Sequence, residues 1–148
     1  MASDTREPRP GERHQPQLPS RPSLPARLEG SCHCGAVRYR VTARSWTVRD
    51  CNCSVCAKKG TLHLIVPQEE FELLSGEAAL RTYRFNTRVA RHTFCGVCGV
   101  QPFYTPRSHP DGVSVNARTL DAVPLGWLEI EPFDGQNWED NVATIQRR

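Results

Sequence analysis

The sequence lacks any long apolar run. Its first ten residues, MASDTREPRP, contain no apolar core like that of a secretory signal, and no later stretch is as long as a membrane span. We therefore expect no membrane association and a protein of the cytoplasm, with the nucleus as a second location. Such a reducing compartment keeps cysteine thiols free to bind metal.

A strong charge of either sign is absent as well. The 148 residues carry a formal net charge of +3, which is too small to indicate a nucleic-acid partner. Residues 1–28 hold +2 of this charge, with five arginines against three acidic residues, so the remainder holds +1. We therefore expect no nucleic-acid binding, and a near-neutral domain disfavours a zinc-ribbon nucleic-acid binder.

Helical periodicity is scarce, and no internal repeat of full length is present. At most, the stretches PQEEF (67–71) and NWEDNVATIQ (137–146) could form short helices. Strand-like alternation is frequent instead, as in AVRYRVTA (36–43), which reads as a half-buried strand. Many short strands at regular spacing predict a mainly β, single small domain of short antiparallel strands. Further strand-like stretches cover residues 61–67, 80–86, 89–95, 100–106, 112–119 and 127–133.

Composition divides the chain into three parts. Residues 1–28 hold half of the twelve prolines and almost no large apolar side chains, so they cannot bury enough surface to offset the entropy of ordering. We expect this segment to be a disordered, Pro/Arg-rich tail. The folded domain is expected at residues 29–140, followed by a C-terminal tail at residues 141–148.

Seven cysteines are many for this length, and the odd number leaves one thiol unpaired in any scheme made only of disulfides. Metal binding is therefore the expected use of these thiols. They form three groups: CHC at 32 and 34, CNCSVC at 51, 53 and 56, and CGVC at 95 and 98. The two thiols of CHC would project from one face of a strand, and CGVCG suits a knuckle turn whose backbone amides point at the thiolates.

Two partitions of these thiols are compatible with their spacing. In the first, the CHC and CGVC pairs close one tetrahedral zinc site, and the trio in CNCSVC holds a second zinc with an open position, as catalytic zinc sites do. In the second, the last two cysteines of CNCSVC join the CGVC pair in a zinc ribbon. A histidine could also complete the site of the trio, with His33, His63 and His92 as candidates, although each alternates with apolar neighbours as a structural histidine does. The spacing leaves these alternatives open.

The sequence resembles the family of glutathione-dependent formaldehyde-activating enzymes and centromere protein V at four stretches: GSCHCGAVRYRV, CNCSVC, FNTRVARHTFCGVCGVQPFYTPRSHPDG and VNARTLD. The resemblance covers about residues 28–140 and is closer to the centromere protein V branch. It implies a β-rich fold of the β-tent type that is stapled by zinc, with two zinc ions per chain.

The resemblance also implies roles for the cysteines and an activity. The structural zinc would be bound by Cys32, Cys34, Cys95 and Cys98. The catalytic zinc would be bound by Cys51, Cys53 and Cys56. The implied activity is that of a carbon–sulfur lyase or synthase, which reversibly joins formaldehyde to the thiol of glutathione as S-(hydroxymethyl)glutathione. The centromere protein V branch implies an alternative, a non-catalytic binding module associated with chromatin or microtubules.

Glutathione carries two carboxylates and an amine, so its site should offer cations and hydrogen-bond donors. Arg107 in FYTPRSHPDG is the candidate for binding a carboxylate, because guanidinium matches carboxylate with two hydrogen bonds, but it could equally stabilise a turn. Lys58 and Lys59 could offset the net negative charge of zinc with three thiolates, although an exposed turn is the favoured interpretation. No general base is evident in the sequence.

Overall fold

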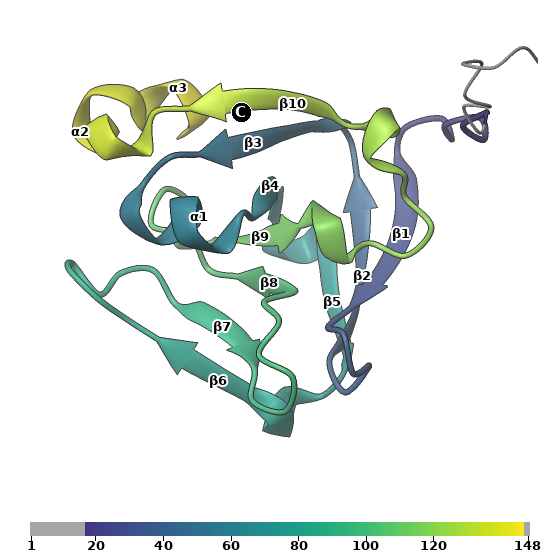
Figure 1. The fold of residues 1–148 in the computed structure, drawn as a ribbon, viewed down its shortest axis with the longest axis horizontal. Helices are drawn as coiled ribbons and strands as arrows, with labels where there is room; N and C mark the ends of the chain where they lie inside the picture. Colours follow the sequence, from purple (N-terminus) through teal and green to yellow (C-terminus); the bar gives the residue numbers. More distant parts are fainter. Residues whose placement is uncertain (1–16, 147–148) are drawn as a thin grey trace, which may run out of the picture.

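Three β-sheets form most of the structure, a computed structural model that describes residues 17–146 (Figure 1). The strands have two to six residues, and the longest helix has six. The prediction of a mainly β domain of short strands is therefore confirmed. None of the helices in residues 17–146 is long and apolar enough to span a membrane.

The largest sheet has five strands in the order β10-β3-β4-β9-β8. Its pairs are antiparallel except that β10 lies parallel to β3, which differs from the predicted antiparallel pairing. A parallel pair needs a long connection, and most of the other elements lie between these two strands in the sequence. The strands are β3 (Thr47–Cys51), β4 (Leu62–Pro67), β8 (Phe103–Tyr104), β9 (Gly112–Asn116) and β10 (Glu129–Phe133).

The second sheet has the order β1-β2-β5, and its strands run across the direction of β3, β4 and β9 in Figure 1. Tyr39, Val41 and Ala43 of β2 are buried, so the apolar face of AVRYRVTA lies in the core as predicted. This face shares one hydrophobic core with Leu64 and Val115 of the five-stranded sheet. The strands are β1 (Ala26–Ser31), β2 (Arg38–Ala43) and β5 (Phe71–Ser75), and the third sheet pairs β6 (Leu80–Tyr83) with β7 (His92–Cys95).

Short helices and 3-10 turns connect the strands. The two predicted helical stretches are present, the first as a 3-10 turn and the second as two α-helical turns. The helix α1 was not predicted. The α-helices are α1 (Ser54–Lys59), α2 (Trp138–Asn141) and α3 (Ala143–Gln146). The 3-10 turns are η1 (Gln68–Glu70), η2 (Glu77–Ala79), η3 (Ala117–Thr119), η4 (Leu125–Trp127) and η5 (Gly135–Asn137).

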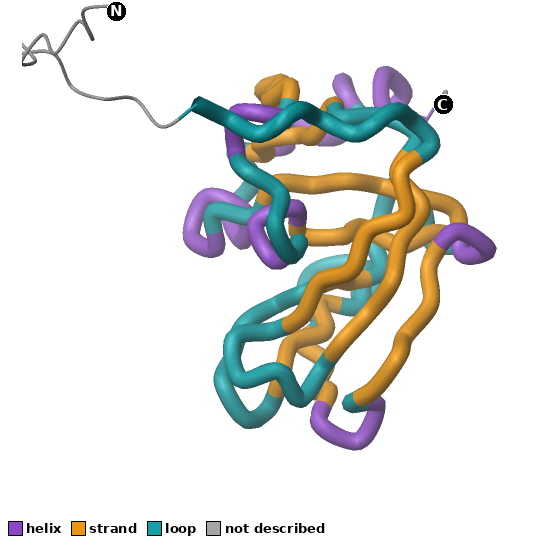
Figure 2. Tube along the Cα trace, turned by 90° about the vertical axis from the view of Figure 1, so that its right-hand side faces the viewer, coloured by secondary structure: helices purple, strands orange, loops and turns teal. Residues whose placement is uncertain are grey.

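The ordered part of the N-terminal region begins before residue 29. The loop that precedes β1 runs along one edge of the fold (Figure 2). There the Arg21 guanidinium lies over the Trp46 ring at 5.7 Å, and the Trp127 indole donates to the Pro19 carbonyl at 2.8 Å. Contacts between arginine, proline and tryptophan therefore order a segment that composition assigns to the tail. The expectation of disorder for residues 1–16 lies outside the described residues.

The C-terminal region is also packed on the domain beyond residue 140. Ile145 of α3 is buried, and the Gln146 side chain donates to the Ser108 carbonyl at 3.0 Å. Residues 141–146 are thus part of the fold rather than a tail, because one buried apolar side chain anchors the final turn. This end of the chain lies close to the second group of cysteines.

Candidate functional site

The first cysteine group joins two turns that are far apart in the sequence. Cys32 and Cys34 follow β1, whereas Cys95 ends β7 and Cys98 follows it, and the four sulfurs lie within 4.8 Å of one another. The Cys34 sulfur lies 3.7 Å from those of Cys32 and Cys95. The CHC stretch forms a turn, because the Gly35 N–H donates to the Cys32 carbonyl. The expectation that its two thiols share one face of a strand is wrong.

Backbone N–H groups surround these sulfurs, as the knuckle turn predicts. The Val97 N–H donates to the Cys95 sulfur at 3.4 Å. Gly99, at φ +82°, has the left-handed conformation that closes this turn by donating to the Cys95 carbonyl. Hydrogen bonds from the backbone, chiefly from Cys34, lower the pKa of Cys98 to about 6. Four convergent sulfurs with such donors fit a closed tetrahedral metal site.

The second group, which we call the trio, comes from one continuous stretch. Cys51 ends β3, Cys53 precedes α1 and Cys56 lies within α1, and their sulfurs lie within 4.8 Å of one another. Among residues 17–146, no fourth cysteine, histidine or carboxylate joins this convergent group. The structure therefore brings the cysteines together as four plus three, and the zinc-ribbon alternative does not match their positions.

The sulfurs of the trio lie too close together for all three to ionise without a cation. Hydrogen bonds from Cys51 and Cys56 lower the pKa of Cys53. Hydrogen bonds with the other two cysteines raise the pKa of Cys56 well above its usual range. Three such sulfurs fit a divalent metal ion, which would replace the shared protons and let all three become thiolates.

His63 of β4 contacts the trio from the side of the sheet. Its Nε2 lies 3.3 Å from the Cys56 sulfur, and its ring is buried. Its Nδ1 lies 3.1 Å from the hydroxyl of Tyr104 and 3.1 Å from the hydroxyl of Ser114. Burial lowers the pKa of His63 to about 4, so the ring is neutral at pH 7.

The other two candidate histidines lie elsewhere. His33 is exposed in the CHC turn of the first cysteine group. His92 is buried on β7, where its ring stacks on Tyr104 with 5.0 Å between centroids and on Phe85 with 5.2 Å. Neither ring belongs to the convergent group of sulfurs. His92 therefore packs as a structural histidine does, whereas the exposed ring of His33 does not match that interpretation.

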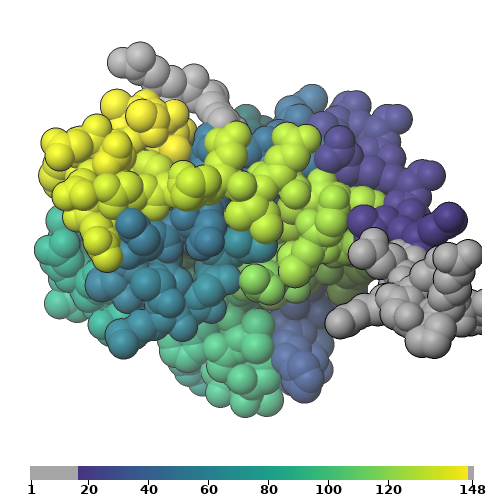
Figure 3. Space-filling view, turned by 45° about the horizontal axis from the view of Figure 1, so that its top comes forward, coloured from purple at the N-terminus to yellow at the C-terminus, as the bar shows by residue number. Residues whose placement is uncertain are grey.

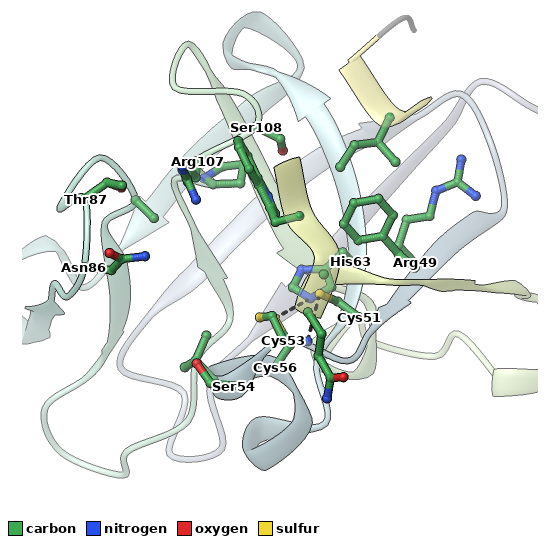
Figure 4. Close-up of a pocket in the computed structure, with 18 of the residues that line it drawn as sticks. Arg49, Cys51, Cys53, Ser54, Cys56, His63, Asn86, Thr87, Arg107 and Ser108 are labelled. Atoms are coloured by element: carbon green, nitrogen blue, oxygen red, sulfur yellow. Dashed lines mark hydrogen bonds between the residues drawn. The ribbon is translucent and has the colours of Figure 1, made fainter. Parts of the chain in front are cut away.

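A cavity of about 750 Å³ opens beside the trio (Figure 4). In this view the three cysteines and His63 gather together, and Asn86 and Thr87 from the β6–β7 connection lie across from them. A thiol or a small aldehyde that enters the cavity could therefore reach the sulfurs. Much of the remaining wall is aromatic or aliphatic, from Val55, Phe85, Tyr104, Phe133, Trp138 and Ile145.

Residues 134–145, which we call the C-terminal wall, close one side of this cavity. In Figure 3 the end of the chain (yellow) lies against the segment that contains α1 (blue). Gly135 has no room for a side chain, because a Cβ there would collide with the Cys51 sulfur. Asn52 lies between two cysteines and donates to the Asp134 carboxylate at 3.0 Å. The C-terminal wall therefore holds the loop that carries the trio.

Arg107 lines the cavity, but its guanidinium already has two partners. It lies 3.7 Å from the centre of the Trp138 ring and donates to the Glu139 carboxylate at 3.0 Å. These contacts hold the C-terminal wall against the loop that follows β8. Substrate binding by Arg107 stays a prediction. Lys58 and Lys59 are exposed as expected, but they belong to the last turn of the helix α1 and not to a connecting turn.

Sequence reasoning missed α1, the contact between His63 and Cys56, and the C-terminal wall. The helix α1 is too short for periodicity to reveal, although a Lys-Lys-Gly ending is typical of a helix C-terminus. His63 was one of three equivalent candidates, and no local signal separates it from the others. Gly135 follows Asp134 in a dipeptide that is typical of turns, but nothing local connects it with Asn52.

A family model and a curated relative carry the name of the same family, and a solved structure shares the fold. The family model described as "Glutathione-dependent formaldehyde-activating enzyme" matches residues 27–135. A curated protein of Halomonas elongata, provisionally named as an enzyme of this kind, is 56% identical over 32 residues, or 21% of this chain and 20% of that protein. A crystal structure of a Rhodobacter sphaeroides protein matches with a TM-score of 0.65 and 33% identity, over 71% of this chain and 98% of that one. The match to the curated relative thus spans about a fifth of its length.

Proposed function

Because this chain belongs to the family of glutathione-dependent formaldehyde-activating enzymes, we propose that it is a zinc-dependent carbon–sulfur lyase or synthase. Its reaction is the reversible addition of the glutathione thiol to formaldehyde or a related aldehyde, which gives S-(hydroxymethyl)glutathione in the case of formaldehyde. The thiol sulfur forms a bond to the carbonyl carbon, and the thiol proton passes to the carbonyl oxygen. The observation that carries this proposal is the three-sulfur group that opens on a cavity.

The two cysteine groups suit zinc in two different roles. Zinc binds thiolates in tetrahedral geometry, with four protein ligands in structural sites and three in catalytic sites. The first group supplies four sulfurs, and the trio supplies three. A zinc ion at the trio would supply Lewis acidity toward a carbonyl oxygen, or would hold a thiol as the nucleophilic thiolate.

The residues of the cavity would bind and orient the two substrates. The cavity is far larger than formaldehyde and has the size of sites that hold drug-sized ligands, which suits a thiol as large as glutathione. Arg107 would bind a glutathione carboxylate, in competition with Glu139. Apolar side chains such as Phe133 and Ile145 would exclude water from the sulfurs.

The test is exchange NMR of glutathione with formaldehyde in the presence of the zinc-loaded protein. We expect faster exchange with the wild type and no acceleration with Cys56→Ser, in which the trio loses one ligand. Circular dichroism and zinc content provide the control, because this variant should keep its fold and one zinc ion per chain. Equal acceleration by both proteins would contradict a catalytic role of the trio.

A wild-type protein that accelerates nothing would favour the alternative from the centromere protein V resemblance. In that case zinc would only stabilise a module that binds chromatin or microtubules. Co-sedimentation with microtubules and with nucleosomes would then be the next measurement. The charge of the chain is a poor fit to this alternative, because +3 offers few contacts to a polyanionic partner.

A further inference from the structure

His63 is a buried imidazole whose two nitrogens face different partners. Its Nε2 lies 3.3 Å from the Cys56 sulfur, and its Nδ1 lies 3.1 Å from the hydroxyls of Tyr104 and Ser114. Ser114 is 0% exposed and Tyr104 is 8% exposed, so water has little access to either hydroxyl. The partners of each nitrogen therefore decide which of the two carries hydrogen.

The buried hydroxyl protons favour an unprotonated Nδ1. Each hydroxyl carries a proton and must donate it, because buried polar groups are costly when unpaired, and no buried polar side-chain atom of residues 17–146 lacks a partner. If Nδ1 is an acceptor, its lone pair accepts the proton of one of the two hydroxyls. If Nδ1 carried hydrogen, neither hydroxyl could donate to it.

We propose that Tyr104 and Ser114 hold His63 in the tautomer with hydrogen on Nε2, and that this N–H donates to the Cys56 thiolate. His63 is then a positioning residue, which fixes the orientation of a metal ligand and withdraws charge from its sulfur. This inference rests on the proposed function, because it assumes that the trio binds a metal ion.

The other two sulfurs of the trio receive hydrogen bonds from the backbone. The Cys53 N–H donates to the Cys51 sulfur at 3.5 Å, and backbone N–H groups of Val55 and Cys56 interact with the Cys53 sulfur. The Cys56 sulfur has a side-chain donor instead. Three thiolates give a zinc(II) site a net charge of −1, and each hydrogen bond reduces the charge that a sulfur passes to the metal. The His63 donor therefore keeps the metal attractive to a fourth, exchangeable ligand.

The geometry fits a donor better than a fourth metal ligand. The three sulfurs converge within 4.8 Å of one another, and His63 is not part of that convergent group. A ligand nitrogen would also need a free lone pair directed at the metal, whereas the hydroxyl pattern places hydrogen on Nε2. The open position of the trio thus stays available to a substrate.

The tautomer can be read directly from the zinc-loaded, full-length protein labelled with ¹⁵N-histidine. Two-bond ¹H–¹⁵N correlations distinguish hydrogen on Nε2 from hydrogen on Nδ1, and the His63 signals are identified by their loss in His63→Gln. We expect hydrogen on Nε2 in the wild type and in Tyr104→Phe or Ser114→Ala, because one hydroxyl still donates to Nδ1. The double variant should populate both tautomers. A wild-type ring with hydrogen on Nδ1 would overturn the proposal.

Cobalt(II) in place of zinc reports on the bond between sulfur and metal. We compare His63→Gln, whose amide can still donate, with His63→Phe, which fills the space without donating. We expect the charge-transfer band of the trio to move to lower energy in His63→Phe, and its cobalt affinity to fall about ten- to hundredfold. His63→Gln should resemble the wild type. If His63→Phe does not fold, the double hydroxyl variant provides the same comparison.

The matched control is His109→Phe. The Nδ1 of His109 also contacts a serine hydroxyl, that of Ser108 at 2.9 Å, but its ring does not line the cavity beside the trio. This variant should leave the cobalt spectrum unchanged. For the proposed reaction, His63→Phe should lower kcat about ten- to hundredfold, while the KM for glutathione stays within about twofold.

The outcomes separate this inference from the proposed function. A wild-type protein that binds only one cobalt ion per chain would remove the metal from the trio, and would contradict the proposed function first. Two cobalt ions with identical spectra for wild type and His63→Phe would overturn the role of His63 alone. A change of the ligand-field bands in both His63→Gln and His63→Phe would identify His63 as a ligand, which also overturns the proposal.

Discussion

The first cysteine group, which we now call the closed group, and the trio, which is the open group, differ in where their sulfurs come from and in what lies beside them. The closed group takes two sulfurs from each of two distant turns, so protein ligands would fill all four positions around a bound zinc ion. The trio takes three sulfurs from six consecutive residues and lies on the wall of a cavity. Residue type is the same in both groups. The number of sulfurs and the adjacent space therefore distinguish a site that staples the fold from a site that can accept a substrate.

The two groups also differ in what else holds their backbone in place. The closed group links the turn after β1 to the turn after β7, and its Cys32 and Cys95 belong to the hydrophobic core. The trio begins at the end of β3, which is paired with β4 and β10 in the largest sheet. Loss of a ligand should therefore unfold the domain at the first group and spare it at the second.

The largest effect is expected for Cys98→Ser, which opens the closed group. Binding of structural zinc contributes about 10 kcal/mol or more in zinc peptides, and a whole domain is stable by about 5–15 kcal/mol. We expect this variant to be unfolded, or to lose most of its thermal transition, in circular dichroism. A variant that melts at the wild-type temperature would contradict a structural role of the closed group.

Cys56→Ser removes one sulfur of the trio and tests whether the fold depends on that group. The variant should retain the wild-type circular dichroism spectrum, lose one of two zinc ions and no longer accelerate the exchange of glutathione with formaldehyde. Zinc content and exchange NMR on the same sample check this result. If Cys56→Ser and Cys98→Ser unfold alike, the two groups do not have different roles.

Spacing and periodicity in the sequence predicted several features of the fold and of the two cysteine groups. Alternation in AVRYRVTA placed Tyr39 and Val41 in the core, and the family resemblance selected the four-plus-three partition that the structure brings together. The knuckle turn at Cys95 also followed from the sequence, because CxxCG encodes its turn within five residues. These features are local or repeat at short range, which is why a sequence reveals them.

The parts that sequence reasoning missed depend on contacts between distant residues. Asn52 contacts Asp134, and the ring of His63 contacts the hydroxyl of Ser114. No periodicity connects such pairs, because they meet only after the sheets have formed. The predicted start of the domain at residue 29 was too late for the same reason, because Arg21 donates to the carbonyl of Trp127, far along the chain.

Gly135→Ala should sharpen the comparison by affecting the trio alone. The new Cβ would collide with the Cys51 sulfur and crowd Cys53, so we expect the metal affinity of the trio to fall about tenfold while the closed group stays loaded. Competition with a chelator, followed by zinc content, measures both sites in one titration. Gly126→Ala is the matched control, because its Cβ would meet only the flexible end of Leu18. Equal affinity in both variants would show that the C-terminal wall does not support the trio.

Arg107→Ala tests whether the cavity beside the trio binds glutathione by charge, and its effect is expected on substrate binding alone. A hydrogen bond to a charged group contributes about 1.5–3 kcal/mol, so loss of a carboxylate contact should raise the KM for glutathione about tenfold or more. A thiol without carboxylates should show an unchanged KM. Arg44→Ala is the matched control, because Arg44 also pairs with a glutamate, Glu70, at the surface.

Glu139→Gln should change the KM for glutathione in the opposite direction to Arg107→Ala. Glu139 accepts a hydrogen bond from Arg107 and so competes with a substrate carboxylate. Removing its charge should free the guanidinium and lower the KM for glutathione about two- to threefold, because an exposed ion pair is worth less than about 1 kcal/mol. If Arg107→Ala instead raises the KM equally for both thiols, Arg107 acts by holding Trp138 and the C-terminal wall. The geometry of the trio would then depend on the C-terminal wall. Selectivity for glutathione over other thiols would have to be provided by other residues of the cavity.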